Sequence, residues 1–571
     1  MKITEKNFDG VYIKYDGENA EIGYGSKAQK MRAEFMLNKK IENGEKSFEI
    51  SETPVFDLCG PMIDVSRGGV MTAESVCRFV KKCAQLGLNM IMLYTEDVYE
   101  MPEYKSFGYM RGRYSAEELR RIDSYASSLG VEVIPCIQTL GHLAKFLRLG
   151  EAPAENGSVL LCGDEKVYKF IECEIKTMSE VFKSRRIHLG MDEADGLGLG
   201  KYLSKHGLRD KMDIFNEHLK RVLEIATKYG FEPMIWSDMY FSSDSPQDYY
   251  EPDYVIPQHA IDNAPENVSL VFWDYYHKEY DYYDKKFIQH ERFKNKTVFA
   301  GGIWTWDGYV PNFKYTLDTM APALSCAAKH GVKTVLATMW GNDGTETPME
   351  LAESSLAVFS EYCYKGDKCT EEDIFRAAEY ISGEPRELTD AVAAFHCGFD
   401  GADRVGKSVI YGDLLLDTVW HDIDYASVSE IYEKSLETVN KYKKCRYYAY
   451  YNALFSAALK KADIMGKLRP AYETGDKTEL ARIALADIPE LSKLYQNFYN
   501  EFKKAWLETN KVFGFEKFQH RFGGMNMRFE FVSERLLDYA EGRTDKIDEF
   551  CEEVIKGINK TWRDFADYSQ I

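Results

Sequence analysis

The sequence predicts a (β/α)8 TIM barrel, in the α/β class, with a small α/β region before it and an all-α domain after it. Strand signals and amphipathic helical stretches alternate eight times over about 300 residues. The first 50 residues stand outside this alternation. Beyond about residue 355 the strand signals stop, and long helical stretches fill roughly the last 200 residues. We therefore expect domains at 1–50, 51–355 and 356–571.

The N-terminal region has strand and helix signals of its own. Alternating apolar residues predict short strands at Val11–Tyr15 and Ala20–Tyr24. A helical pattern follows at about Lys27–Asn38. These elements predict a small α/β appendage that precedes the barrel.

Eight short apolar runs are the expected barrel strands. They are Pro61–Val65, Asn89–Tyr94, Val131–Ile137, Ile187–Gly190, Pro233–Trp236, Val268–Trp273, Thr297–Trp304 and Thr334–Trp340. Amphipathic stretches of helical period lie between most of them, for example Ala73–Leu86, Ala116–Leu129, Met212–Tyr229 and Leu317–His330. A glycine stops several of these helices just before the next strand: Gly87, Gly130, Gly230 and Gly331. The segment Tyr240–Asn267 is rich in Asp, Pro and Ser and predicts a long loop.

The C-terminal third predicts helices alone. The longest helical patterns are Val428–Cys445, Tyr447–Leu468, Ile488–Asn510 and Phe529–Tyr539. An apolar helical domain of this kind is also a candidate interface for a homodimer.

Composition and charge exclude several classes of protein. The 571 residues are 45% hydrophobic and 29% charged, which is ordinary for a globular chain and excludes a disordered chain or a small disulfide scaffold. The net charge of -20 argues against nucleic acid as a partner. We expect no membrane span and no signal peptide, because apolar runs of the required length are missing. The 12 cysteines form no CxxC pair, so we expect reduced core thiols and a cytoplasmic protein.

In a barrel of this kind the active site lies at the carboxyl ends of the strands, and here those ends carry acids and tryptophans. Five of the 8 Trp residues fall at the ends of the last four strands: Trp236, Trp273, Trp304, Trp306 and Trp340. Aromatic faces pack against the C–H face of a pyranose, and neighbouring polar groups bind its hydroxyls. This pattern favours a saccharide pocket.

Asp192 and Glu193 are the central pair, because they follow an apolar strand and a glycine at the mouth of the fourth strand. Adjacent carboxylates do not fit the usual acid and nucleophile of a retaining glycosidase, which lie about 5 Å apart across the scissile bond. They fit a mechanism in which one acid protonates the leaving oxygen and the other orients a group of the substrate.

The motifs at the strand ends resemble those of family 20 glycoside hydrolases, the β-N-acetylhexosaminidases. HLGMDEA at 188–194 resembles the H-x-G-x-D-E signature, and DVSR at Asp64–Arg67 resembles the first-strand motif. Thr95-Glu96-Asp97 lies where the family usually has Ser/Thr-Asp-Asp, Gly141–Leu143 resembles its P-G-H motif, and the order of the tryptophans also matches. The resemblance covers about residues 51–350 and is strongest to a bacterial intracellular branch with a helical C-terminal domain. Three departures are Leu140, Met191 and Glu96, which replace a Pro, a Gly and the second-strand Asp of the family pattern.

The resemblance implies substrate-assisted catalysis with retention, on terminal β-linked GlcNAc or GalNAc of an oligosaccharide or glycoconjugate. Asp192 would hold the acetamide N–H, and Glu193 would act as acid and then base. Tyr275, Tyr276 and Tyr309 are all candidates for holding the acetamide, and Tyr275 is favoured because it shares a face with Trp273 at period two. The expected substrate-binding residues are Arg67, Glu96, Asp97, His142, Trp236, Trp273, Tyr276, Trp304, Trp306, Tyr309, Trp340 and Asp343.

Several interpretations stay open at this stage. His142 either contacts the sugar or orients a carboxylate, and Asp343 either binds a distal hydroxyl or closes a turn. A metal-dependent hydrolase is poorly supported, because only His142 and His188 of the 11 histidines lie near strand ends, so we expect no metal and no cofactor. A non-catalytic sugar-binding barrel and a substrate-assisted O-GlcNAc hydrolase of another family remain as alternatives.

Overall fold

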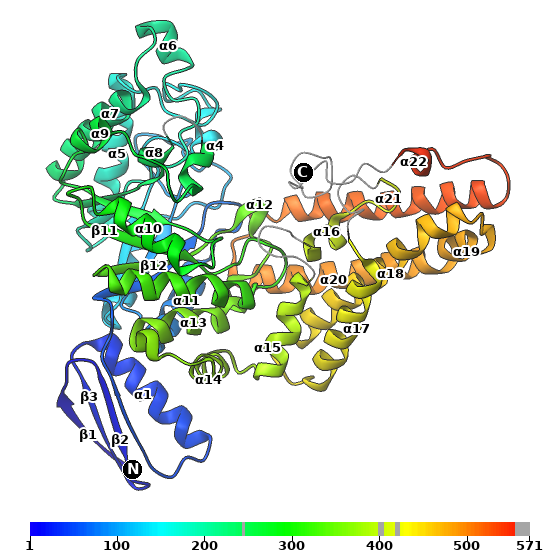
Figure 1. Ribbon diagram of the computed structural model, residues 1–571, viewed down its shortest axis with the longest axis horizontal. Coiled ribbons are helices and arrows are strands. Elements are labelled where there is room, and N and C mark those ends of the chain that lie inside the picture. Colours follow the sequence, from blue (N-terminus) through cyan, green and yellow to red (C-terminus); the bar gives the residue numbers. More distant parts are fainter. Residues whose placement is uncertain (243–245, 398–404, 417–422, 554–571) are drawn as a thin grey trace. The chain divides into compact units, whose positions relative to one another are not determined.

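The computed structural model describes residues 1–242, 246–397, 405–416 and 423–553, which form two compact units (Figure 1). The first unit comprises Met1–Ile303, Thr316–Trp340 and Ser355–Ile381. The second comprises Trp304–Tyr315, Gly341–Ser354 and the chain from Ser382 onward. The second unit is therefore built from three separate stretches of the sequence.

A closed barrel of eight parallel strands is the centre of the first unit, and this confirms the predicted fold class. Each strand neighbours the next along the chain, and β12 closes the barrel against β5. The strands are β5 (Leu58–Asp64), β6 (Met90–Tyr94), β7 (Glu132–Cys136), β8 (Arg186–His188), β9 (Glu232–Trp236), β10 (Ser269–Trp273), β11 (Thr297–Gly302) and β12 (Thr334–Met339). All eight coincide with predicted apolar runs.

Helices cover the outside of the barrel and bury one apolar face each. The longer ones are α2 (Ala73–Gln85), α3 (Ala116–Ser128), α5 (Glu165–Val181), α7 (Lys211–Lys228), α10 (Tyr280–His290) and α11 (Phe313–Lys329). Capping side chains mark where α2 and α3 begin. Thr72 accepts a hydrogen bond from the Ser75 N–H before α2, and Ser115 forms a capping box with Glu118 before α3. The glycine after α2, Gly87, has φ 81°, as a helix stop requires.

The predicted loop at Tyr240–Asn267 contains short helical turns. They are the end of α8 (Asp238–Phe241), the 3-10 helix η1 (Pro246–Tyr250) and α9 (Gln258–Asp262). Segments rich in Asp, Pro and Ser rarely form long helices, and the helical turns here are short. The predicted long connection between the fifth and sixth barrel strands therefore agrees with the described part of this segment.

The N-terminal region is a four-stranded sheet of order β1-β3-β2-β4 with one helix, α1 (Lys27–Glu42). β2 (Val11–Tyr15) and β3 (Asn19–Tyr24) were predicted, and β1 (Lys2–Asn7) and β4 (Phe48–Glu52) were not. β1 has no buried residue, so it lacks the apolar alternation by which a strand is recognised.

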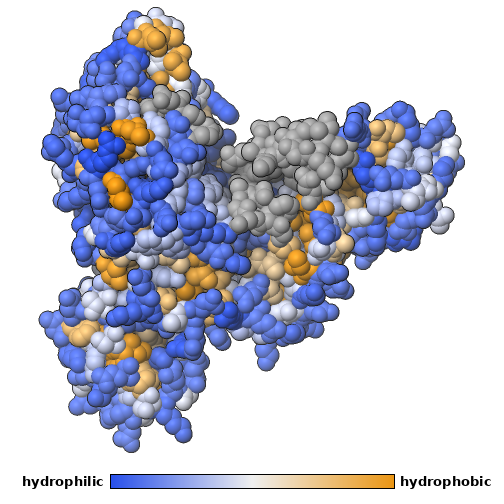
Figure 2. Space-filling model, viewed as in Figure 1, coloured by the Kyte–Doolittle hydropathy of each residue, from blue (hydrophilic) through white to orange (hydrophobic). Residues whose placement is uncertain are grey.

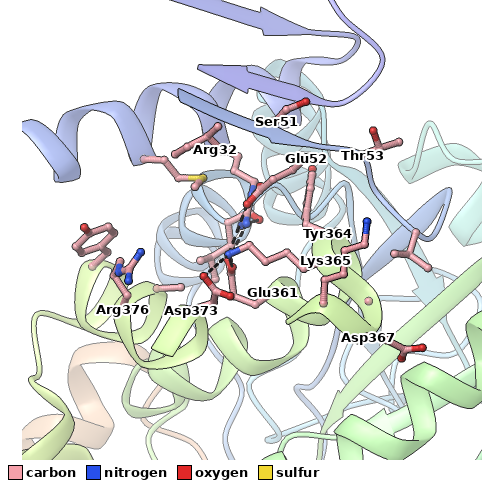
Figure 3. A pocket seen from close by; sticks show the side chains of 18 of the residues that line it. Arg32, Ser51, Glu52, Thr53, Glu361, Tyr364, Lys365, Asp367, Asp373 and Arg376 are labelled. Carbon is pink, nitrogen blue, oxygen red and sulfur yellow. Dashed lines mark hydrogen bonds and ion pairs between the residues drawn. The ribbon is translucent and has the colours of Figure 1, made fainter. Parts of the chain in front are cut away.

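Arg32 of α1 joins this region to the amino-terminal end of the barrel (Figure 3). Its guanidinium is fully buried and donates to Glu52 at 2.9 Å and to Glu361 at 2.7 Å. Glu361 belongs to α13 (Glu353–Lys365), where Lys365 lies 2.7 Å from it. These side chains line a cavity of about 840 Å³ near Leu86, at the end of α2. Since this end of a barrel is remote from the strand mouths, we assign the cluster a role in stability.

The second unit is helical, and its core is one large apolar cluster. Its long helices are α17 (Tyr425–Lys441), α18 (Tyr448–Glu473), α20 (Ile488–Thr509) and α21 (Glu516–Ala540). The first three match predicted helices, whereas α21 begins 13 residues before the predicted start at Phe529. The loops after β11 and β12 fold with these helices, and Glu346 of the second loop pairs with Lys407 at 2.6 Å and with Arg521 at 2.9 Å.

The surface shown in Figure 2 is mainly hydrophilic, with local apolar clusters. One lies at α6 (Lys201–His206), where Leu199, Leu203 and Leu208 are exposed. Within the described part of the chain, none of the helices combines the length and the apolar character that a membrane crossing needs. All 12 cysteines lie in the described residues, none of them forms a disulfide there, and seven are buried.

Candidate active site

Asp192 and Glu193 lie directly after β8, in a strained stretch of backbone. Met191 has φ 74° and Glu193 has φ 44°, a region that side chains other than glycine rarely adopt. His142, which follows β7, has φ 55°. Each such residue costs on the order of 1–3 kcal/mol, and residues of this kind cluster at functional sites. The family glycine that Met191 replaces would adopt this conformation without strain.

Gly190, just before this stretch, is required by packing. Its φ is 71°, and a Cβ there would lie 2.1 Å from the side-chain oxygen of Gln138. Gln138 lies just past β7, so the glycine lets the ends of the third and fourth barrel strands approach closely. This contact brings Gln138 to the acid pair.

The Asp192 carboxylate is buried and held by two neighbours. His142 Nε2 lies 3.1 Å from Oδ2, and Gln138 Nε2 donates to Oδ1 at 3.1 Å. Burial opposes ionisation of Asp192, but the nearby charge of His142 and the hydrogen bond of Gln138 outweigh it and lower its pKa to about 2. Burial also disfavours a charged His142, but Asp192 raises the histidine pKa to about 10. The pair is therefore a carboxylate and an imidazolium at neutral pH.

Glu193 points to a more open environment than Asp192. Its side chain is 55% exposed, and its Oε2 lies 3.4 Å from His142 Nε2. Its backbone N–H donates to Oδ2 of Asp238 at 2.9 Å. Burial and then the charge of Asp192 raise the pKa of Asp238 to about 8. Asp238 thus fixes the turn at Glu193 and is largely protonated at neutral pH.

Arg67 lies at the mouth of the first barrel strand among acidic and aromatic side chains. Its Nε is 3.3 Å from Glu96 Oε1 and 3.8 Å from Asp64 Oδ2. It also donates to the Tyr94 hydroxyl at 3.3 Å, and its guanidinium lies 4.8 Å from the Trp340 ring. Burial raises the pKa of Glu96, although the charge of Arg67 opposes this. The structure therefore brings Arg67, Glu96 and Trp340 together, as a sugar-binding mouth needs.

Asp97 has a separate partner. Arg111 Nε donates to its Oδ1 at 2.7 Å, and the same arginine donates to the Ser66 carbonyl at 2.6 Å. Asp97 is buried and paired, so in this structure it braces the loops after the first two barrel strands.

Aromatic rings from several strands meet around Trp340 in the barrel unit. Tyr94 packs edge-on against it at 4.7 Å, and Tyr275 lies at 6.5 Å in a T-shaped arrangement. Tyr275 also stacks on Trp273 at 5.3 Å with 22° between the ring planes. Trp236 is 6.2 Å from Trp340 and is fully buried against His188, so it supports the ring cluster from below the surface.

Tyr276 is half-buried and lies beside Tyr275 at 5.9 Å. The face that Tyr275 shares with Trp273, as the period of two predicted, is seen directly in their stacking.

Four predicted site residues belong to the second unit. Trp304 and Trp306 are buried and stack at 4.4 Å. Tyr309 lies in the helical core, where its hydroxyl bonds to that of Tyr411 at 2.5 Å and its ring packs against Phe502. This place does not favour the predicted contact of Tyr309 with a sugar. Asp343 lies in α12 (Asn342–Thr345), and its side chain is outside the described part of the structure.

Sequence reasoning did not select Tyr94, Gln138, Asp238 and Arg111 as site residues. The first three follow or end barrel strands, so a stricter reading of every polar strand end would have found them. Arg111 lies 14 residues after Asp97 in a loop, and nothing local in the sequence marks it.

The donor atoms of His142, Asp192 and Glu193 lie within 4.8 Å of one another, which is close enough for one ion. The charges of His142 and Asp192 favour an ion pair between these two residues over a metal site. An imidazolium beside the carboxylate already neutralises Asp192, and a bound metal ion would have to displace that proton.

A parallel barrel whose strand ends carry adjacent acids, a half-buried guanidinium and stacked indole and phenol rings has the architecture of a glycoside hydrolase. Comparisons with known families agree with this. Residues 59–286 match the model of the glycosyl hydrolase family 20 catalytic domain, and residues 394–564 match that of the glycoside hydrolase 20C C-terminal domain. The chain belongs to glycoside hydrolase family 20.

Individual relatives are distant. The chain is 25% identical over 226 residues to a β-hexosaminidase of Porphyromonas gingivalis, a match that covers 34% of this chain and 29% of that protein. It is 27% identical over 213 residues to human hexosaminidase D, covering 33% of this chain and 39% of that protein. The chain thus spans less than half the length of these two relatives.

A similar fold is found in the exo-β-N-acetylglucosaminidase of Vibrio harveyi, solved with N-acetylglucosamine. The TM-score is 0.51 at 16% identity, covering 66% of this chain and 67% of that one. At this identity the similarity supports the fold.

Proposed function

We propose that this chain is an exo-acting β-N-acetylhexosaminidase that releases terminal non-reducing GlcNAc or GalNAc with retention, by substrate-assisted catalysis. The observation that carries the proposal is the pair at the end of β8: a buried, ionised Asp192 next to an open Glu193. The names of the family's relatives, which are β-hexosaminidases, point the same way.

In the proposed first step the 2-acetamido oxygen attacks the anomeric carbon, while the bond to the leaving oxygen breaks. The product is a cyclic oxazolinium ion, and the nitrogen of the acetamide becomes positive. Asp192 is suited to hold that N–H and to stabilise the positive charge, because His142 and Gln138 keep it ionised and fixed in orientation. Tyr275 is the proposed partner of the acetamide oxygen.

Glu193 is the proposed general acid and base. Its carboxyl donates a proton to the leaving oxygen in the first step, and in the second it takes a proton from the water that attacks the anomeric carbon. Attack of water opens the oxazolinium ring and restores the β-configuration. The 55% exposure of the Glu193 side chain supports this role, since a leaving group and a water molecule both need access.

The remaining pocket residues are proposed to bind the terminal sugar. Arg67 and Glu96 would bind ring hydroxyls, and Trp273 and Trp340 would pack on the pyranose. Asp97, His142 and Trp236 act on these groups indirectly in our proposal, because each is paired or buried in the structure. Tyr276, which is half-buried, is retained as a proposed contact to the aglycone or the distal hydroxyls. The sugar contacts of Trp304 and Trp306, which are buried, and of Asp343, whose side chain lies outside the described residues, stay predictions from the sequence.

The test compares chromogenic substrates that differ in one group. The aryl β-N-acetylglucosaminide should be hydrolysed, and the matched aryl β-glucoside, which lacks the acetamide, should be hydrolysed very poorly. A thiazoline mimic of the oxazolinium ion should bind far more tightly than GlcNAc. Comparable turnover of both glycosides would reject substrate assistance. Failure to turn over either would favour a sugar-binding barrel, and cleavage restricted to GlcNAc on peptides would favour an O-GlcNAc hydrolase.

We further propose a cytoplasmic location and a homodimer. The 12 cysteines, none of which forms a disulfide in the described structure, support a reducing compartment. On α21, Met527 and Phe531 are exposed one turn apart and provide an apolar surface for a second copy. Light scattering on the purified chain should give twice the monomer mass of 65.8 kDa; the monomer mass at micromolar concentration would reject the dimer.

A further inference from the structure

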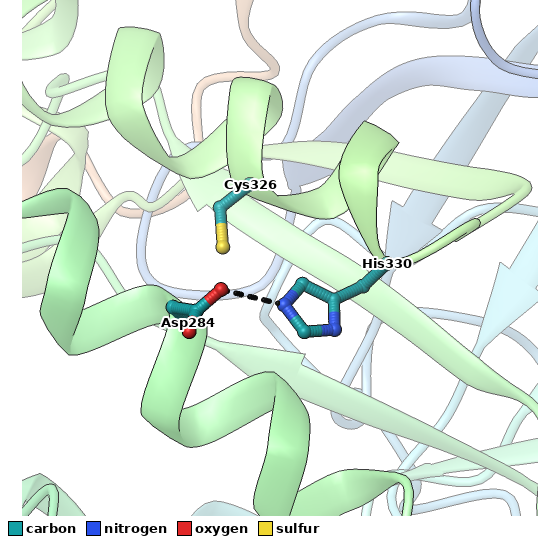
Figure 4. A group of neighbouring side chains, drawn as sticks. All are labelled: Asp284, Cys326 and His330. Atoms are coloured by element: carbon teal, nitrogen blue, oxygen red, sulfur yellow. Dashed lines mark hydrogen bonds and ion pairs between the residues drawn. The ribbon is translucent and has the colours of Figure 1, made fainter.

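Three side chains with metal-binding donors converge on the outside of the barrel, between α10 and α11 (Figure 4). Cys326 lies on α11, and His330 is the first residue after that helix. The two are four residues apart, about one helical turn, so both side chains face the same side. Asp284 comes from α10. The cysteine sulfur, a carboxylate oxygen and a ring nitrogen all lie within 4.8 Å of one another.

The spacing of these atoms fits a small transition-metal ion. In tetrahedral zinc sites the bonds to N, O and S are about 2.0–2.3 Å, which places neighbouring ligand atoms roughly 3.3–3.8 Å apart. His330 Nε2 and Asp284 Oδ1 are 3.0 Å apart. Changes of about 1 Å or less therefore bring the three donors to zinc geometry.

His330 is oriented as a metal ligand is. Its Nδ1 lies 2.7 Å from Glu291 Oε1, so this nitrogen donates its hydrogen to the carboxylate. A carboxylate in this position fixes the tautomer and aims the other nitrogen at the metal. If the ring is neutral and Nδ1 carries the hydrogen, Nε2 has a lone pair. That lone pair would then point at a lone pair of the Asp284 oxygen, and the two would repel each other. A cation between them, either a proton or a metal ion, removes that repulsion.

The cluster has one open side. Cys326 is fully buried and the His330 side chain is 11% exposed, whereas that of Asp284 is 31% exposed. An ion can therefore enter past Asp284, and water can supply a fourth ligand. Lys329 Nζ lies 3.4 Å from Asp284 Oδ1, but its side chain is 65% exposed and can turn to solvent when an ion takes over its role.

We propose that Asp284, Cys326 and His330 bind a divalent ion of the zinc type, which links α10 to α11. Binding forms bonds from the metal to Sγ, Nε2 and a carboxylate oxygen. The thiol proton, and any proton on Nε2, pass to solvent. This site is separate from the acid pair at the strand mouths, it contains a thiol that the acid pair lacks, and it does not depend on the proposed activity.

The test is a cobalt titration of the full chain after treatment with a chelator. Co²⁺ bound to a thiolate gives a sulfur-to-metal charge-transfer band, and a site made only of His142, Asp192 and Glu193 cannot give one. We expect one equivalent to produce the band and Zn²⁺ to remove it. Cys326→Ser should abolish the band, and Cys173→Ser, a change at a partly exposed thiol of α5, should retain it.

Two further variants keep the test decisive if Cys326→Ser folds poorly. His330→Ala should abolish binding, and Glu291→Gln should weaken it by about 10–100-fold, because only the orientation of the histidine is lost. No charge-transfer band in the unmodified chain, or a band that survives Cys326→Ser or His330→Ala, would overturn the proposal.

Discussion

Asp192→Asn tests the acid pair most directly, because it removes one charge and keeps the shape. In the native chain His142 is held as a cation by Asp192, with a pKa of about 10 against an ordinary 6.5. At about 1.4 kcal/mol for each tenfold change in proton affinity, this interval corresponds to on the order of 5 kcal/mol. Breaking buried ion pairs costs about 3–5 kcal/mol. His142 is partly exposed and Asn still accepts a hydrogen bond, so we expect about 3 kcal/mol.

The pH dependence of that loss has a defined sign. His142 has a raised pKa in the folded state, so its contribution to stability is complete below pH 6.5 and is lost as the pH rises towards 10. Asp192 has a lowered pKa, so its contribution is lost as the pH falls from 3.8 towards 2. The variant should therefore be least stable, relative to the native chain, between about pH 4 and 6.5, and the two should converge near pH 10.

Three measurements check the Asp192→Asn prediction. Thermal unfolding at a series of pH values gives the stability difference. Titration of the imidazole resonances by NMR should show the pKa of His142 falling well below 10, because burial is then opposed by Glu193 and no longer by Asp192. Hydrolysis of aryl N-acetylglucosaminides should fall by about 10²–10³, to a similar degree for good and poor leaving groups. Full activity together with an unmoved His142 titration would refute the assignment.

Other substitutions separate the roles of the neighbouring groups. Glu193→Gln should slow hydrolysis by about 10²–10⁴ for poor leaving groups and much less for activated aryl glycosides, and an equal loss on both would argue against the acid role. Arg67→Ala should weaken binding and rate together. The missing hydrogen bond to the sugar costs about 1–3 kcal/mol, and the buried Glu96 left without its cation adds to this cost. An unchanged kcat/KM would contradict the role of Arg67. Asp238 has a raised pKa of about 8, so its contribution to stability is lost as the pH rises from about 4 to 8, and Asp238→Asn should flatten that part of the profile of melting temperature against pH. An unaltered profile would show that Asp238 does not titrate there.

The barrel was predictable from the sequence because its signals are local. Each strand is a short apolar run, and several covering helices, such as α2 and α3, begin with a capping side chain and end just before a glycine. β1 was missed for the converse reason, since it is a mainly polar strand with no buried residue, at the edge of its sheet. α21 begins within a stretch that contains Gly523 and Gly524, whose low helix propensity hides the helix until tertiary packing is known.

The acid pair was predictable, but its surroundings were not. Asp192 and Glu193 follow a strand of the barrel, and strand ends meet at one rim whatever the loops do. The hydrogen bond of Asp238 to the Glu193 backbone and that of Gln138 to Asp192 join residues 45 and 54 positions apart. Tyr309 shows the limit most clearly, because its position shortly after β11 does not reveal that its side chain enters the helical core.

The division of the second unit into three stretches has a consequence for biosynthesis. Residues 304–315 and 341–354 leave the ribosome long before the helices with which they share a core. At about 5–20 residues per second, the remaining chain from Ser382 takes roughly 10–40 s to appear. During that time Tyr309 and Leu351 lack their apolar partners, and Glu346 lacks both of its cations. The barrel therefore emerges with two unfinished loops, and protease treatment of stalled nascent chains should cut there until synthesis of the last helices is complete.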